Sequence, residues 1–326
     1  MNSRHLVDPE LAAVLEQLPP SPPLSAASIP MIRAGSAALL AGRPVPEFPG
    51  RTVSEHHVPG PEGAPDVRAL LYKPTQQTQP TAGLLWIHGG GYIGGSVDAE
   101  DIPTRELAAE LGCVVMSVDY RLAPETPHPG PVEDCYAALK WLHDNAGALG
   151  VDGQRLALAG SSAGGGLVAA LALLVRDRGE IPLAFQAMNA PMLDDRTVQS
   201  DAPHPYTGEF IWTREANRFG WTSLLGREPG GEDVSPYAAA ARAENLEGLP
   251  PAFIAVGALD LFLEEDVEYA RRLIRAGVPT ELHVYPGTFH GYQMVAQAQV
   301  TQKAMRDRLD ALRRALNLPD LAEPMK

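Results

Sequence analysis

Two glycine-rich motifs in the sequence could carry acyl-transfer chemistry. The first, His-Gly-Gly-Gly at 88–91, follows an apolar strand pattern, and the second, Gly-Ser-Ser-Ala-Gly at 160–164, stands between a strand pattern and an apolar helix pattern at 167–175. A serine in such a sharp turn is typical of a nucleophile elbow, where glycines let the backbone turn and leave the middle side chain strained and exposed. The pattern predicts Ser162 as a nucleophile. Ser161 does not fit, because Ala159 stands where its first glycine would be.

The first motif predicts a site that stabilises a developing negative charge. Backbone N–H groups in a glycine turn after a strand can point at an oxyanion, and the residue after the nucleophile adds another from the start of its helix. We expect Gly90, Gly91 and Ala163 to supply these groups. A phosphate-binding loop is the alternative for such a glycine run, but its Lys-Ser/Thr ending is missing, and no acidic residue is placed to bind a dinucleotide ribose.

A serine nucleophile of this kind needs a carboxylate and a histidine that follow it in the chain. Three histidines do so: His204 stands between prolines, His283 lies within an alternating strand pattern, and His290 follows that strand in a glycine-containing loop. The loop position favours His290 as the base. Asp260 lies three residues beyond the buried strand pattern at 251–257, and strand ends of this kind carry the working groups of open α/β sheets. We therefore expect Asp260 to hold the imidazole of His290.

Other polar residues near these motifs are interpreted as structural. The acidic run at 264–266 offers rivals to Asp260, but it is typical of a negatively charged first turn of a helix. The arginine and glutamate of the segment at 120–125 are expected to form an ion pair that holds a loop near the site. His88 precedes the serine, so we expect it to organise its loop through a hydrogen bond rather than to act as a base.

These motifs, in this order, resemble those of the bacterial hormone-sensitive-lipase-like esterases, the family IV carboxylesterases of the α/β-hydrolase superfamily. Asp-Tyr-Arg-Leu-Ala-Pro-Glu at 119–125 and Phe-His-Gly at 289–291 add to the resemblance, which spans most of the chain. It implies hydrolysis of a carboxylic ester through an acyl-enzyme with no metal or organic cofactor, and a homodimer through the last strand of the sheet. Ser161 departs from the family pattern, because many members have aspartate before the nucleophile.

The order of strand and helix patterns predicts an α/β-hydrolase fold, with a mostly parallel central sheet, helices on both faces and a helical cap. Strands are expected near 68–72, 84–88, 114–118, 156–159, 184–189, 253–256 and 281–285. Two helical patterns, 9–18 and 26–40, are separated by prolines at 19–23, and the alternation stops between 194 and 243. The expected parts are a first cap segment at 1–50, core at 51–193, a second cap segment at 194–243 and core at 244–326.

The second cap segment is rich in aromatic residues, which we expect mostly to form the cap's own core. Tyr92, Phe210 and Trp212 are the candidates for walls of a substrate pocket. Since uncharged side chains dominate such a pocket, the sequence predicts a small, neutral ester with a short-to-medium acyl group. An amide, formamide, thioester or lactone stays open, because the same machinery serves each and the pocket decides.

Composition excludes several other classes of protein. The net charge of −14 disfavours nucleic acids and anionic membrane surfaces as partners. The longest nearly uncharged apolar stretch, 164–175, is too short to span a bilayer, and the first residues lack the apolar core of a secretory signal, so we expect a cytoplasmic protein without stable membrane association. Cys113 and Cys135 are expected in the core rather than at a metal or redox site.

Two further functional classes, a ligand receptor and an interfacial lipase, fit the sequence less well. The plant gibberellin receptors resemble the same family but have lost the histidine, so the presence of His290 favours an enzyme over a ligand receptor. An interfacial lipase is disfavoured because the sequence has no long apolar segment suited to exposure at a lipid surface.

Overall fold

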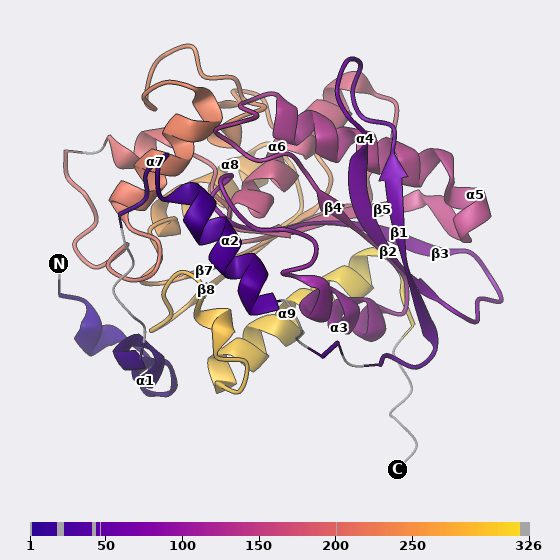
Figure 1. Cartoon of the computed structure of the whole chain (residues 1–326), viewed down its shortest axis with the longest axis horizontal. Coiled ribbons are helices and arrows are strands. Elements are labelled where there is room, and N and C mark those ends of the chain that lie inside the picture. The colour runs from indigo at the N-terminus through magenta and orange to yellow at the C-terminus, as the bar shows by residue number, and fades with distance from the viewer. Residues whose placement is uncertain (1, 18–22, 41–43, 46, 200, 320–326) are drawn as a thin grey trace.

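An eight-stranded sheet forms the centre of the molecule (Figure 1). The computed structural model describes residues 2–17, 23–40, 44–45, 47–199 and 201–319. Side by side, the strands are β1 (Arg51–Val58), β2 (Val67–Pro74), β4 (Val114–Asp119), β3 (Thr81–Ile87), β5 (Val151–Ser161), β6 (Phe185–Asn189), β7 (Ala252–Gly257) and β8 (Thr280–Tyr285). The β1–β2 and β2–β4 pairs are antiparallel, and the remaining pairs are parallel. The predicted fold class is confirmed, and each predicted strand corresponds to an observed one.

Helices cover both faces of the sheet because strand side chains alternate between two apolar layers. In β3, Leu85 and Ile87 join one layer, whereas Leu84 and Trp86 join the other. The first layer contains residues of α4 (Gly130–Asp144), α6 (Ala163–Arg178) and α8 (Leu263–Arg275). The second contains residues of α1 (Pro9–Gln17), α3 (Asp101–Leu111) and α9 (Gln299–Ala315). The short helix α5 (Ala146–Leu149) leads into β5.

The helix that follows the elbow is apolar on all sides. Every residue of α6 from Ala163 to Val175 is buried, and a helix with no polar face is stable only inside a protein. Its N-terminus is therefore held firmly at the carboxyl edge of the sheet. Both cysteines are buried and unpaired, as the sequence predicted.

Two segments outside the sheet lie near the carboxyl ends of its parallel strands. The helix α2 (Ile29–Leu40) begins three residues later than its pattern suggested, because Ser25 and Ser28 exchange hydrogen bonds in a turn before it. Between β6 and β7 the chain forms η2 (Asp195–Val198), α7 (Arg214–Leu225) and η3 (Ala240–Arg242). Short 3₁₀ turns also occur at η1 (Arg4–Leu6) and η4 (Tyr292–Met294).

Some of the sequence predictions concern residues outside the described ranges. Residue 18, with which the first helical pattern ends, and residues 19–22 of the proline-rich connection lie outside the described residues. Within the described ranges, no helix is both long enough and apolar enough to cross a membrane.

Candidate active site

Ser162 lies in the turn between β5 and α6. Its backbone has φ 57° and ψ −122°, a region that costs a non-glycine residue about 1–3 kcal/mol. A Cβ atom on Gly164 would lie 2.1 Å from the carbonyl oxygen of Ile87, so only glycine permits this close approach of α6 to β3. Ser162 N donates to Asn189 O at 2.8 Å, which holds the strained turn against β6. These contacts place the serine hydroxyl at the carboxyl edge of the sheet.

The hydroxyl of Ser162 is bonded to an imidazole that is itself held by a carboxylate. Ser162 Oγ lies 3.0 Å from His290 Nε2, and His290 Nδ1 lies 2.8 Å from Asp260 Oδ2. The other carboxylate oxygen accepts from Phe262 N at 3.0 Å, which fixes its orientation. All three side chains are buried, with 2–9% of their surface exposed, so little water competes for these bonds. The structure brings together the three residues proposed as a triad.

The loops that carry the acid and the base follow adjacent parallel strands. Asp260 comes three residues after β7 ends, and His290 comes five residues after β8 ends. The two strands pair in parallel with Gly257 opposite Tyr285. Because parallel strands end at the same edge of a sheet, the two loops emerge side by side and reach the elbow together.

The glycine motif after β3 forms a tight turn. Gly90 and Gly91 have φ 121° and 62°, and Gly90 O accepts from the N–H groups of Ile93 and Gly94 at 3.1 and 2.9 Å. No acceptor in the described residues takes the N–H of Gly90, Gly91 or Ala163. These three groups therefore remain available to a negatively charged oxygen.

Two side chains hold the glycine-containing loop at residues 88–95, which we call the oxyanion loop after the role that the sequence predicts for it. His88 Nδ1 lies 2.8 Å from Gly89 O, and its ring stacks on Tyr120, so His88 organises the loop as expected. Glu100 accepts from Gly89 N at 3.4 Å and from Trp86 Nε1 at 2.5 Å. Sequence analysis missed Glu100, because a glutamate eleven residues after the glycine it contacts belongs to no recognisable spacing.

The residue before the nucleophile has a structural contact. Ser161 Oγ accepts from Asn189 Nδ2 at 3.1 Å, and Asn189 Oδ1 accepts from Gln293 Nε2 at 3.3 Å. The same asparagine thus supports the elbow through its backbone and its side chain. Serine at this position links the elbow to β6 and to the segment after His290.

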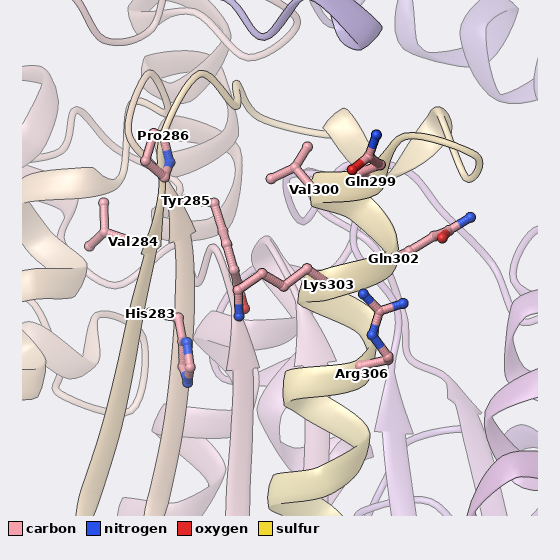
Figure 2. A pocket seen from close by; sticks show the side chains of 9 residues that line it. All are labelled: His283, Val284, Tyr285, Pro286, Gln299, Val300, Gln302, Lys303 and Arg306. Carbon is pink, nitrogen blue, oxygen red and sulfur yellow. The ribbon is translucent and has the colours of Figure 1, made fainter.

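The other two candidate histidines lie elsewhere. His283 Nε2 is 2.7 Å from the Glu281 carboxylate, and its side chain lines an open groove of about 550 Å³ between β8 and α9 (Figure 2). His204 accepts a hydrogen bond from a backbone N–H two residues away, in its own loop. Of the three histidines, it is His290 that contacts Ser162.

The acidic run at the start of α8 is buried in part: Glu264 is exposed, whereas Glu265 and Asp266 are buried. The helix does begin at Leu263, as the interpretation of this run as a first helical turn required. Glu265 accepts from the hydroxyl of Thr197 and from two backbone N–H groups after β6, and so holds the start of the second segment that is predicted to form the cap. Asp266 is fully buried, and neither of its carboxylate oxygens has a partner among the described residues. Within those residues, no cluster of three or more His, Cys, Asp or Glu could hold a metal ion.

Asp266→Asn should stabilise the protein more at high pH than at low pH. Burial, together with the nearby carboxylates of Glu265 and Asp260, raises the pKa of Asp266 well above its usual range. In the unfolded chain the carboxyl of Asp266 ionises near pH 4. The free energy of unfolding therefore falls as the pH rises from about 4 toward the raised pKa of Asp266 in the folded protein. We expect the variant to unfold about 2 °C or more above the parent at pH 8, which corresponds to at least about 1 kcal/mol, with a smaller margin at pH 5 in thermal melts. A margin that grows on acidification would contradict this account.

The expected ion pair between Arg121 and Glu125 is absent, and that prediction was wrong. Arg121 pairs instead with the buried Asp134, with its Nη2 2.7 Å from Oδ1. Glu125 pairs with Arg33 of α2 at 2.9 and 3.0 Å, and Arg33 also donates to Ile93 O at 2.8 Å. The true partner of Glu125 lies 92 residues earlier, so no local spacing could reveal it. The contact ties α2 to the oxyanion loop.

A mostly apolar cavity of about 740 Å³ lies between α2 and the oxyanion loop, and we call it the α2 cavity. Its lining residues are Leu24, Ile29, Ile32, Arg33, Ser36, Ala37, Leu40, Gly90, Ile93, Gly94, Gly95, Ser96, Asp98, Ala99, Leu122 and Trp212. Of the three predicted wall residues, Trp212 is therefore placed at this cavity. None of the triad residues is part of its wall.

The structure places the other two predicted wall residues away from this cavity. Tyr92 is fully buried, and its hydroxyl donates to Met192 O at 3.0 Å. Its positive φ of 66° turns the side chain into the core beside Trp221, a backbone effect that residue type alone does not reveal. Phe210 packs against Phe289, with ring centroids 5.7 Å apart.

The chain is similar to known esterases of the α/β-hydrolase fold. A family model for the α/β-hydrolase fold matches residues 84–294. The chain is 33% identical over 319 residues to carboxylesterase NlhH of Mycobacterium tuberculosis, and the alignment covers 95% of this chain and 97% of that protein. It is 33% identical over 225 residues to ethyl acetate hydrolase of Pseudomonas putida, and this alignment covers 68% of this chain and 70% of that protein. The structure of a bacterial heroin esterase matches with a TM-score of 0.90 and 42% identity, over 97% of this chain and 99% of that one. The chain belongs to the hormone-sensitive-lipase-like branch of the α/β-hydrolase superfamily.

Proposed function

We propose that the protein is a serine carboxylesterase that hydrolyses small esters with short-to-medium acyl groups through an acyl-enzyme intermediate. The observation that carries this proposal is the bonded chain from Ser162 Oγ through His290 to Asp260, with steps of 3.0 and 2.8 Å, at the tip of a strained elbow. Similarity to a carboxylesterase and to an ethyl acetate hydrolase supports it.

The proposed reaction begins when Ser162 Oγ attacks the ester carbonyl carbon while His290 Nε2 accepts the hydroxyl proton. Asp260 holds the proton on Nδ1 and stabilises the imidazolium that forms. The tetrahedral intermediate then expels the alkoxide, which takes the proton from Nε2 and leaves as the alcohol. Water attacks the acyl-enzyme with His290 again as base, and the carboxylic acid is released.

The oxyanion of each intermediate would be held by backbone N–H groups. We assign these donors to Gly90, Gly91 and Ala163, which have no acceptor among the described residues. Donors that are already aimed at the site stabilise charge without reorganising during the reaction, and one such donor typically contributes about 10²–10³ in rate. This chemistry needs no metal or organic cofactor.

The surroundings of the base favour a neutral and compact substrate. The rings of Phe262 and Trp212 lie 5.2 and 6.3 Å from the ring of His290. Aromatic side chains at this distance exclude water and give a charged substituent no partner. Initial rates on p-nitrophenyl esters from acetate to palmitate test the proposal. Activity that peaks at short chains supports it, whereas no activity on any ester, with turnover of an amide, formamide, thioester or lactone, would replace it.

We retain the division of the chain made from the sequence as part of this proposal. Residues 1–50 and 194–243 would form the cap, and 51–193 and 244–326 the hydrolase core. In support, α2 and Trp212 come from the two cap segments and meet at the α2 cavity. The helix α1 packs on the core instead, where Leu11 is fully buried. A cytoplasmic location also stays a prediction, and the unpaired cysteines suit a reducing compartment.

We further propose a homodimer that pairs β8 with its counterpart, because β8 is an edge strand of the sheet and Val284 on it is 42% exposed. An edge strand presents backbone N–H and C=O groups that can pair with a strand of another chain. Val284→Lys should convert a dimer into a monomer in light scattering, with turnover kept. A parent protein that is already monomeric, or a variant that stays dimeric, would refute the interface.

A further inference from the structure

Trp212 stands at the border between the triad and the α2 cavity. Its ring centroid is 6.3 Å from that of His290, and its side chain forms part of the cavity wall, together with Gly90 of the oxyanion loop. Ser162 and His290 do not line the cavity, although residues on its near side are those of the oxyanion loop. The indole therefore lies where a passage from the serine to the cavity would run.

The indole passes through a space that two glycines leave open. A Cβ atom on Gly91 would lie 2.1 Å from Cη2 of the Trp212 ring. On α7, a Cβ atom on Gly220 would approach the same ring to 3.4 Å and Gly91 O to 2.8 Å. The ring is thus packed directly against the backbone of an assigned oxyanion donor.

The backbone before Trp212 is strained into this position. Ile211 has φ 62°, which is an outlier for a β-branched residue. Trp212 N donates to Phe210 O at 2.7 Å across it, in a three-residue turn of the rare kind. Trp212 Nε1 donates to the fully buried Asn217 at 3.1 Å. Strain that is kept at a ligand site and held by such bonds commonly has a function.

We propose that Trp212 is the specificity-determining gate of this enzyme, which closes the α2 cavity to the substrate and so limits the size of the ester. The cavity has the volume and apolar lining of a site for a drug-sized ligand, yet the indole separates it from the serine. Removal of the indole joins the two spaces. The enzyme then accepts a longer apolar group on the side of the oxyanion loop. This inference rests on the proposed esterase function.

The test compares chain-length preference in Trp212→Ala and the parent. Two series are measured, p-nitrophenyl esters that lengthen the acyl group and linear alkyl acetates that lengthen the alcohol. In one of the series, the ratio of kcat/KM for the eight-carbon to the two-carbon member should rise at least about tenfold. Such a rise corresponds to roughly two methylenes entering an apolar site, at about fourfold each. An unchanged ratio in both series overturns the proposal.

Two further variants decide whether the gain uses the α2 cavity. Ala37 lines the cavity on α2, so Trp212→Ala/Ala37→Trp refills it and should return the ratio to that of the parent. A gain that persists in the double variant overturns the gate. Tyr206→Ala removes an exposed aromatic from the same cap segment and should leave the ratio unchanged.

Failure of the gate and failure of the esterase function give different results. Turnover of p-nitrophenyl acetate by the parent, and its loss in Ser162→Ala, report on the function alone. The ratio of long to short substrates reports on the gate alone. If Trp212→Ala does not fold, Trp212→Leu also shortens the side chain while it retains apolar packing, and the same ratios then apply.

Discussion

We expect Ser162→Ala to reduce kcat on p-nitrophenyl acetate by about 10⁴–10⁶, because the variant has no hydroxyl to form the acyl-enzyme. The hydrogen bond from Ser162 Oγ to His290 Nε2 disappears with it. Loss of the hydroxyl should leave the fold intact, since the elbow is held by the backbone bond to Asn189 O and by the close contact of Gly164. Steady-state kinetics, with circular dichroism as the check on folding, measure both effects. Activity within tenfold of the parent would mean that another residue is the nucleophile.

The identity of the base is tested by three matched substitutions. His290→Ala should approach the loss seen for Ser162→Ala, because the serine and its base act as one unit. His283→Ala and His204→Ala serve as controls, since these side chains bond to Glu281 and within their own loop. Comparable losses in all three variants would undo the assignment.

Asp260→Asn should lower kcat by about 10⁴ with little change in the fold. The amide that replaces the carboxylate offers a donor where His290 Nδ1 now meets Oδ2 at 2.8 Å. The imidazole would then carry its proton on Nε2, the wrong nitrogen for a base, and the charge formed on attack would lose its partner. Phe262 N still finds an acceptor in the amide oxygen, so the loop should keep its shape.

Glu264→Gln provides the matched control for this second prediction. Glu264 lies in the first turn of α8, four residues after the proposed acid, and its substitution should change kcat less than threefold, or about 0.6 kcal/mol in the barrier. The reverse order of the two losses would transfer the role of acid to the helix.

Features of the sheet could be predicted from the sequence because each is encoded locally. Strand patterns, glycine positions and chain order suffice to place Ser162, Asp260 and His290 at the carboxyl edge of a parallel sheet. The two antiparallel pairings that involve β2 are less evident, since a buried strand carries no mark of its direction.

Contacts between distant parts of the chain could not be predicted in this way. The pairing of Arg33 with Glu125 and the hold of Glu265 on the segment after β6 depend on tertiary packing alone. The position of the Tyr92 side chain could not be predicted either, because an aromatic residue suits a pocket wall as well as a core. Its positive φ turns the side chain into the core, where it is fully buried.

The tight contact between α6 and β3 means that the elbow should tolerate few substitutions, whereas α2 and the stretch around Trp212 should tolerate many. Because Gly164 touches the carbonyl of Ile87, any enlargement of the elbow would displace the strand that leads to the oxyanion loop, and both halves of the chemistry would fail together. From the second segment predicted to form the cap, the side chain of Trp212 reaches this centre. Libraries that vary α2 and the stretch around Trp212 should therefore yield new substrate ranges at high frequency, whereas libraries at the elbow should yield inactive protein.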